Sequence, residues 1–192
     1  MKELYDKILK EGKICPGDIV KVDSFLNHQV DVNFMERIGA EFYNLFKDSG
    51  INKIVSIETS GVIVAMEVAK LFDCRLVFAK KGKPLNQDNS FYESKVMSYT
   101  RHSEVEIRLA KEYLTKEDKV LVIDDFLANG SAINGLLDII NQSGATLIGC
   151  GVVIEKGFQP GGKGLREKGI RLESLAIIDE IDVDKQTIKF RD

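Results

Sequence analysis

The stretch VLVIDDFLANGSA, at residues 120–132, joins strand-forming residues to two adjacent aspartates and a small turn that contains glycine. The apolar run predicts a strand, and the following segment, SAINGLLDIINQSG, predicts a helix. In an open parallel sheet, ligands bind beyond the carboxyl ends of the strands, so Asp124 and Asp125 lie where a ligand is expected. The turn ANGSA can offer backbone N–H groups and the start of a helix to an anion.

Two carboxylates would repel an anion that they touched, so the pair is expected to bind a neighbouring group with hydroxyl donors or positive charge. A ribose 5-phosphate meets both demands, because carboxylates accept hydrogen bonds from its 2- and 3-hydroxyls while the turn holds its phosphate. Two other interpretations stay open for the pair alone: a solvated turn, or a magnesium site of the P-loop type. The absence of a G-x-x-x-x-G-K-[ST] loop from the sequence disfavours magnesium.

Outside this stretch, short apolar runs alternate with helical segments. Strands are expected at 53–58, 75–80, 119–124 and 146–154, and helices at 60–72 and 131–144. The expected strands are too apolar to have one face exposed to solvent. This alternation of strands and helices therefore predicts an α/β fold with a mainly parallel, twisted sheet flanked by helices. Segment 80–114 breaks the rhythm and is expected to form an inserted, flexible hairpin or loop.

The two ends of the chain carry weaker patterns. Residues 2–11 predict an amphipathic helix, and Asp31 is expected to cap a second helix whose apolar face includes Phe34, Ile38 and Phe42. Residues 181–190 alternate in polarity and predict a terminal strand or hairpin. No repeat or linker divides the sequence, so residues 1–192 are expected to form a single domain.

The composition limits the function classes. The net charge of −3 gives no support for a nucleic-acid partner, and no apolar run reaches the length of a membrane span. Three separated cysteines and two histidines offer no zinc-binding spacing, so the cysteines are expected to be buried and reduced. The charged start of the sequence is unlike a signal peptide. These features predict a cytoplasmic protein.

The sequence resembles the type I phosphoribosyltransferases, and among them the bacterial xanthine phosphoribosyltransferases. The stretches that carry the resemblance are KVDSFLNHQVD, KIVSIETSG, FAKKGKPL, IDDFLANG and VVIEKGFQPG. The resemblance implies a core at about 50–155, covered by a hood built from about 1–30 and 156–192. It also implies a homodimer, and a flexible loop around residues 98–101 that closes over the active site.

The resemblance implies a reaction in which N9 of a purine displaces pyrophosphate from C1 of phosphoribosyl pyrophosphate (PRPP), with Mg²⁺ on the diphosphate. Asp124 and Asp125 are then the catalytic pair at the ribose. The expected PRPP ligands are Ala128, Asn129, Gly130, Ser131, Ala132, Thr59, Ser60 and Lys81, and the expected xanthine ligands are Val20, Asn27 and Lys156. No side chain is expected to bind the metal directly, because Mg²⁺ arrives with PRPP.

The sequence departs from the common motif of that family. Asn129 and Ala132 stand where many relatives have hydroxyl side chains, and Ala128 cannot act as a base. Because a few hood contacts decide the choice of purine, guanine, hypoxanthine or adenine stays an alternative to xanthine. A PRPP-binding regulator that binds DNA is a further alternative, although the acidic charge disfavours it. Phe158 is expected either to stack on the base or to pack in the core.

Overall fold

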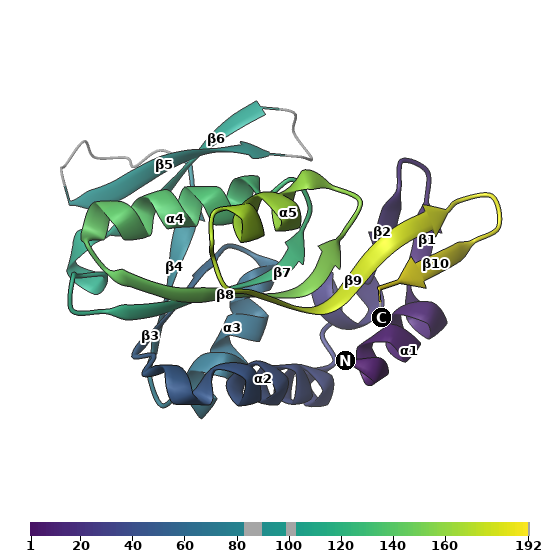
Figure 1. Cartoon of the computed structure of the whole chain (residues 1–192), viewed down its shortest axis with the longest axis horizontal. Coiled ribbons are helices and arrows are strands. Elements are labelled where there is room, and N and C mark those ends of the chain that lie inside the picture. The colour runs from purple at the N-terminus through teal and green to yellow at the C-terminus, as the bar shows by residue number, and fades with distance from the viewer. Residues whose placement is uncertain (83–89, 99–102, 192) are drawn as a thin grey trace.

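The computed structural model describes residues 1–82, 90–98 and 103–191 of the chain (Figure 1). The helices are α1 (Lys2–Glu11), α2 (Val32–Phe46), α3 (Ser60–Leu71), α4 (Ser131–Ser143) and α5 (Pro160–Glu167). The strands are β1 (Lys13–Cys15), β2 (Ile19–Lys21), β3 (Lys53–Ile57), β4 (Arg75–Lys81), β5 (Phe91–Ser98), β6 (Ser103–Ala110), β7 (Lys119–Leu127), β8 (Thr146–Lys156), β9 (Leu172–Asp182) and β10 (Thr187–Phe190). A π-helical turn at Asp23–Asn27 and 3-10 turns at Lys47–Ser49 and Lys111–Tyr113 complete the elements.

The main sheet has the strand order β10-β9-β8-β7-β3-β4-β6-β5. Its centre is parallel, because β9, β8, β7, β3 and β4 run in the same direction. The edges are antiparallel, with β10 paired to β9 and the β5–β6 hairpin paired to β4. The carboxyl ends of the central strands therefore meet at one edge of the sheet, where ligands bind in such folds.

Helices cover both faces of the sheet, with α2 and α3 on one side and α4 and α5 on the other (Figure 1). Asp31 caps α2 by accepting a hydrogen bond from the N–H of Phe34 at 3.1 Å. The inner face of α2 buries Phe34, Ile38, Phe42 and Phe46 completely. Full burial of each such side chain contributes about 1.5–3 kcal/mol, so the α2 face is a main source of stability.

The β5–β6 hairpin packs closely on α4. A Cβ atom at Gly135 would lie 2.3 Å from Cγ1 of Val96 and 3.0 Å from Cδ1 of Ile107, so only glycine allows this approach. The hairpin therefore continues the sheet and shares the core beneath α4. This contact brings the end of β5 next to the start of α4.

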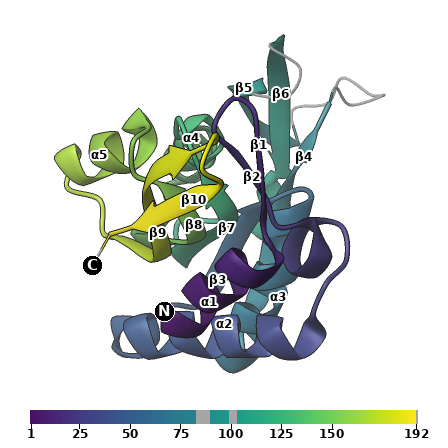
Figure 2. The same ribbon diagram turned by 90° about the vertical axis from the view of Figure 1, so that its right-hand side faces the viewer.

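An arm formed by β1 and β2 stands beside the β9–β10 hairpin (Figure 2). The two ends of the chain meet here, because the rings of Tyr5 and Phe190 stack with centroids 4.4 Å apart. Among the described residues, no helix is long and apolar enough to cross a membrane.

The predicted α/β fold, with its mainly parallel sheet flanked by helices, is confirmed. The helix at 2–11, the cap at Asp31 and the hairpin alternatives for both irregular segments are also confirmed. The sequence patterns did not reveal α5 or β9. Of the cysteines, Cys150 is buried, whereas Cys15 and Cys74 are half-buried, so their expected full burial is wrong. The expected loop around 98–101 falls mostly on residues 99–102, outside the described residues.

Candidate functional site

Asp124 and Asp125 lie near the carboxyl end of β7 and differ in exposure. Asp124 is buried, and its Oδ1 accepts a hydrogen bond from the N–H of Asp125 at 3.0 Å. Burial, followed by the neighbouring charge of Asp125, raises the pKa of Asp124 well above its ordinary value. Asp125 is half-buried, and its Oδ2 accepts a hydrogen bond from the side-chain amide of Asn27 at 2.8 Å. An expected purine ligand is thus in contact with an expected ribose ligand.

Thr59 and Ser60, two of the expected PRPP ligands, lie at the N-terminal end of α3, as its N-cap and its first residue. This end of α3 lies against β7, because a Cβ atom at Gly61 would lie 2.5 Å from Oδ1 of Asp124. The peptide bond between Glu58 and Thr59 is cis, and the side chain of Thr59 makes no capping bond to the helix. The close approach at Gly61 brings the start of α3, with its unpaired backbone N–H groups, next to the expected catalytic pair.

The turn after β7 is held by a glycine and by local hydrogen bonds. Gly130 has a φ of 85°, a left-handed conformation that favours glycine, and it immediately precedes α4. The carbonyl of Gly130 accepts hydrogen bonds from both the N–H and the side-chain amide of Asn134. The N–H of Ser131 donates to Oδ1 of Asn129 at 2.9 Å. Asn129 therefore supports the turn through its oxygen and keeps its amide N–H groups free to donate.

A cavity of about 210 Å³ opens above this turn. Its lining comprises Ile57, Lys81, Val96, Met97, Val105, Phe126, Leu127, Ala128, Asn129, Gly130, Ser131, Ala132 and Ile133. Lys81 brings a positive charge from β4, and its N–H donates to Oε1 of Glu58 at 2.5 Å. The expected 5-phosphate ligands, residues 128–132, thus share a cavity with Lys81. The volume is sufficient for a phosphate and part of a sugar.

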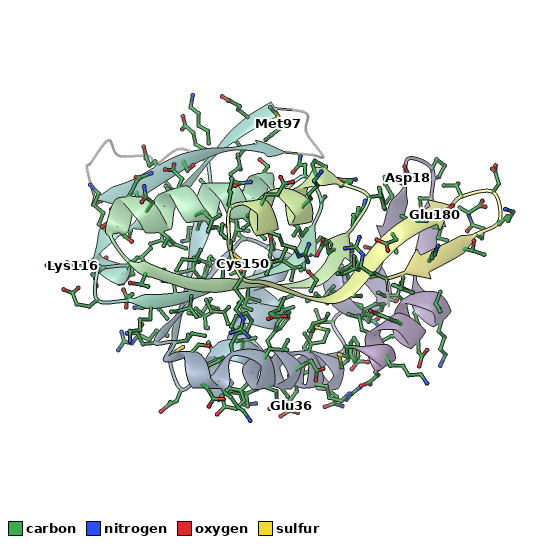
Figure 3. All side chains as sticks on the ribbon, in the orientation of Figure 1. Asp18, Glu36, Met97, Lys116, Cys150 and Glu180 are labelled. Atoms are coloured by element: carbon green, nitrogen blue, oxygen red, sulfur yellow. The ribbon has the colours of Figure 1, made fainter. Side chains whose placement is uncertain are left out.

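The β5–β6 hairpin takes part in this cavity. The backbone N–H of Met97 donates to Oγ of Ser131 at 2.6 Å, so the hairpin is bonded to the turn that faces the cavity. In the view of Figure 3, Met97 on the hairpin lies at the top of the molecule and Asp18 on the arm lies at the upper right. The sequence did not reveal the contribution of the hairpin, because strand alternation does not show which helix a hairpin will cover.

Of the expected xanthine ligands, Val20 comes from the arm, Asn27 from the π-helical turn and Lys156 from β8. Val20 is buried in β2, and Lys156 is buried at the end of β8. Nζ of Lys156 donates to the carbonyl oxygen of Asp18 at 2.9 Å, which ties the arm to the sheet. Burial lowers the pKa of Lys156, although the nearby charge of Asp18 partly opposes this effect. Phe158 is 41% exposed, so the core-packing alternative for this ring is wrong.

Helix α5 connects the end of β8 to the turn at residues 128–132. The N–H of Gly161 donates to the carbonyl of Ala128 at 3.0 Å. A Cβ at Gly161 would lie 2.4 Å from that oxygen, so the contact requires glycine. Behind it, the buried carboxylate of Glu155 accepts two hydrogen bonds of 2.7 Å from Arg166 and one of 2.5 Å from Ser174. This bidentate pair fixes α5 against the sheet.

The site residues converge from several strands, but they do not form a metal cage. Among the described residues, no group of three His, Cys, Asp or Glu side chains could hold a metal ion. Mg²⁺ typically keeps several waters and is bound by one or two carboxylates together with substrate phosphates. The donor set here, a positive Lys81 beside a turn of backbone N–H groups, suits phosphate oxygens.

Comparison with known proteins gives consistent results. The phosphoribosyl transferase domain model matches residues 26–172. A xanthine phosphoribosyltransferase 2 from Clostridium botulinum is 54% identical over 190 residues, which cover 98% of this chain and 100% of the relative. The xanthine phosphoribosyltransferase of Clostridioides difficile is 49% identical over 192 residues, with complete coverage of both chains.

Solved structures show the same fold. The adenine phosphoribosyltransferase of Giardia lamblia, complexed with 9-deazaadenine, superposes with a TM-score of 0.75 at 24% identity, covering 91% of this chain and 96% of that one. The adenine phosphoribosyltransferase of Rhodothermus marinus gives a TM-score of 0.73 at 18% identity, covering 92% and 99%. From the matched domain and the near-complete coverage of its relatives, this chain belongs to the phosphoribosyltransferase family.

Proposed function

We propose that the protein transfers the 5-phosphoribosyl group from PRPP to N9 of xanthine and releases xanthosine 5-monophosphate and pyrophosphate. The family and the names of relatives about half identical to this chain support the proposal. The single observation that carries it is the hydrogen bond between Asn27 and Asp125. This bond joins a side chain suited to a purine edge to one suited to a ribose hydroxyl, as a transfer between the two substrates requires.

The aspartate pair acts at the ribose. Displacement at C1 develops positive charge on the sugar ring, and carboxylates beside the ring stabilise that charge. Asp125, which is partly exposed, accepts the hydrogen bonds of the ribose hydroxyls. Asp124 holds the backbone of Asp125 through the 3.0 Å bond to its N–H and adds negative charge behind it.

The cavity beside α4 holds the phosphates. Backbone N–H groups at residues 128–132 and the start of α4 bind the 5-phosphate, and Lys81 faces the diphosphate. Mg²⁺ bound together with PRPP would supply positive charge to the diphosphate. Met97 bonds Oγ of Ser131 and so holds the turn in the shape that receives the phosphate.

The base lies between Asn27 and Lys156. A lysine offers donors only, which suits the carbonyl oxygens of an oxopurine and does not suit the amino group of adenine. Asn27 both donates and accepts, as an edge with N–H and C=O groups requires. Xanthine is therefore favoured, and another purine is the alternative, since few contacts decide the choice.

The test is a comparison of bases. Purified protein with Mg²⁺, PRPP and each of xanthine, guanine, hypoxanthine and adenine should form xanthosine 5-monophosphate with the highest kcat/KM. Faster turnover of adenine would refute the choice of base. No turnover with any base, together with binding of PRPP, would favour a regulator instead.

The role of the aspartates has its own test. The double variant Asp124→Asn/Asp125→Asn keeps the size and shape of both side chains and removes their charges. It should lose most of its turnover while its circular dichroism spectrum stays unchanged. Wild-type turnover and an unchanged KM for PRPP would contradict the proposed role at the ribose.

We further propose that the protein works in the cytoplasm as a homodimer. Cys15, Cys74 and Cys150 are all free thiols, which suits a reducing compartment. Sedimentation of the purified protein at micromolar concentration should give the mass of two chains, and the mass of one chain would refute the dimer.

A further inference from the structure

Ser56 is a polar residue in an unfavourable place. It lies near the end of β3 and is completely buried, and within the described part of the chain its Oγ has no hydrogen-bond partner. A buried hydroxyl without a partner destabilises a fold, and alanine would fill almost the same space. Such a group calls for an explanation in terms of function.

Ser56 lies close to Asp124, a member of the proposed catalytic pair. A Cβ atom at Gly61 would lie 2.9 Å from Oγ of Ser56 and 2.5 Å from Oδ1 of Asp124. Both oxygens therefore border the same small space, which exists only because residue 61 has no side chain. The hydroxyl of Ser56 is a hydrogen-bond donor without an acceptor, and the carboxylate of Asp124 is an acceptor that is buried away from water.

We infer that Ser56 is a positioning residue, whose hydroxyl donates to Oδ1 of Asp124 when PRPP binds and holds that carboxylate in its charged form. The inference rests on the proposed function, because it assigns Ser56 to the PRPP half of the site. Gly61 makes the bond possible by leaving the gap between the two side chains unfilled. In the free protein the hydroxyl of Ser56 borders the same space as the carboxylate of Asp124 but makes no hydrogen bond to it.

The electrostatic surroundings favour such a donor. Burial, and then the charge of Asp125 on the same strand, raise the pKa of Asp124, whereas the charge of Lys81 on β4 opposes the rise. Cys150 on β8 faces Asp124 as well, and burial, with a contribution from Asp124, raises its pKa to about 12, so this thiol stays neutral. A hydrogen bond from Ser56 would stabilise the charged carboxylate and lower the pKa of Asp124.

The decisive variant is Ser56→Ala. We expect its melting temperature to equal or exceed that of the wild type, because it loses a polar group without a partner. The KM and Kd for PRPP with Mg²⁺ should rise about tenfold, as for a lost hydrogen bond to a charged group, while the KM for xanthine stays unchanged. The acidic limb of kcat, which reports groups in the substrate complex, should move to higher pH, because without the hydroxyl the remaining influences keep the pKa of Asp124 high.

Two further variants separate positioning from packing. Ser143→Ala removes a buried hydroxyl that donates to the carbonyl of Ile140, far from the site, so it should lower the melting temperature and leave both KM values unchanged. Ser56→Cys keeps the size of the side chain and weakens the donor, so it should reproduce the change in PRPP affinity even if Ser56→Ala does not fold.

Wild-type PRPP affinity in Ser56→Ala or Ser56→Cys would overturn the inference. A lower melting temperature with equal losses for both substrates would overturn it too, since that pattern belongs to packing. Isothermal calorimetry with PRPP and Mg²⁺ requires no turnover. If the wild-type protein binds PRPP but does not convert xanthine, the proposed function fails while the Ser56 inference is still tested.

Discussion

Replacing Arg166 with methionine should destabilise the fold by about 2–3 kcal/mol. The side chain of Glu155 is 2% exposed and that of Arg166 is 37% exposed. Burial alone would raise the pKa of Glu155, but hydrogen bonds from Arg166 and Ser174 outweigh it and lower that pKa. Breaking a fully buried pair costs about 3–5 kcal/mol, and the partial exposure of Arg166 reduces this figure. For a chain of this length, the melting temperature should fall by roughly 4–12 °C.

Urea denaturation at several pH values measures this loss. At neutral pH the variant leaves a buried negative charge that has lost both hydrogen bonds from Arg166 and keeps the one from Ser174. As the pH falls below 4.5, the ordinary pKa of a glutamate, and then through the lowered pKa of the folded Glu155, the wild type loses the stability that this lowered pKa provides. The difference between variant and wild type should therefore shrink as the pH falls through the carboxyl range.

A double-mutant cycle decides whether the charge is the cause. Adding Glu155→Gln to Arg166→Met removes the uncompensated charge, so the double variant should be more stable than Arg166→Met alone. The reasoning would be refuted if Arg166→Met lowered the free energy of unfolding by less than about 0.5 kcal/mol. A double variant less stable than either single variant would refute it as well.

The site gives three more predictions. Lys156→Ala should raise the KM for xanthine at least about tenfold with a smaller effect on PRPP, whereas Lys163→Ala, at an exposed ion pair on α5, should change neither. In Gly61→Ala the new methyl group would meet Oδ1 of Asp124, so PRPP affinity should fall sharply, while Gly164→Ala, with no atom within 4 Å, should leave affinity intact and stabilise α5. Because its pKa is raised, Asp124 takes up a proton at a higher pH than an ordinary carboxyl, so kcat/KM for PRPP should fall below that pH; a profile that is flat down to pH 4 would contradict this assignment.

The predictable part of the fold follows from local patterns. The apolar runs around residues 53–58 and 119–124 are buried on both faces, so their composition alone indicates central parallel strands. Asp31 before an apolar helical period marks a helix start, and the structure shows that capping bond. The acidic pair and the glycine turn are predictable for the same reason, because strand, turn and helix are contiguous in the sequence there.

Contacts between distant segments left no comparable signal. The bond between Asn27 and Asp125 joins segments 98 positions apart, and no local pattern records it. Helix α5 contains several glycines and has a weak helical pattern, yet close packing on Ala128 requires Gly161. In the sequence, Ser56 does not differ from an ordinary strand residue. Only its burial close to Asp124 in the structure sets it apart from other serines.

The glycine at position 135 makes the effect of one substitution depend on another. Glycine inside a helix costs about 1 kcal/mol relative to alanine, and α4 accepts this cost because Val96 occupies the space of the missing methyl group. Gly135→Ala alone should therefore push the hairpin away from α4 and disturb the hydrogen bond from the N–H of Met97 to Oγ of Ser131. In a Val96→Ala background the same substitution should stabilise the protein. The two positions are thus expected to show sign epistasis, so a scan of single variants would not reveal that Gly135→Ala can stabilise the protein.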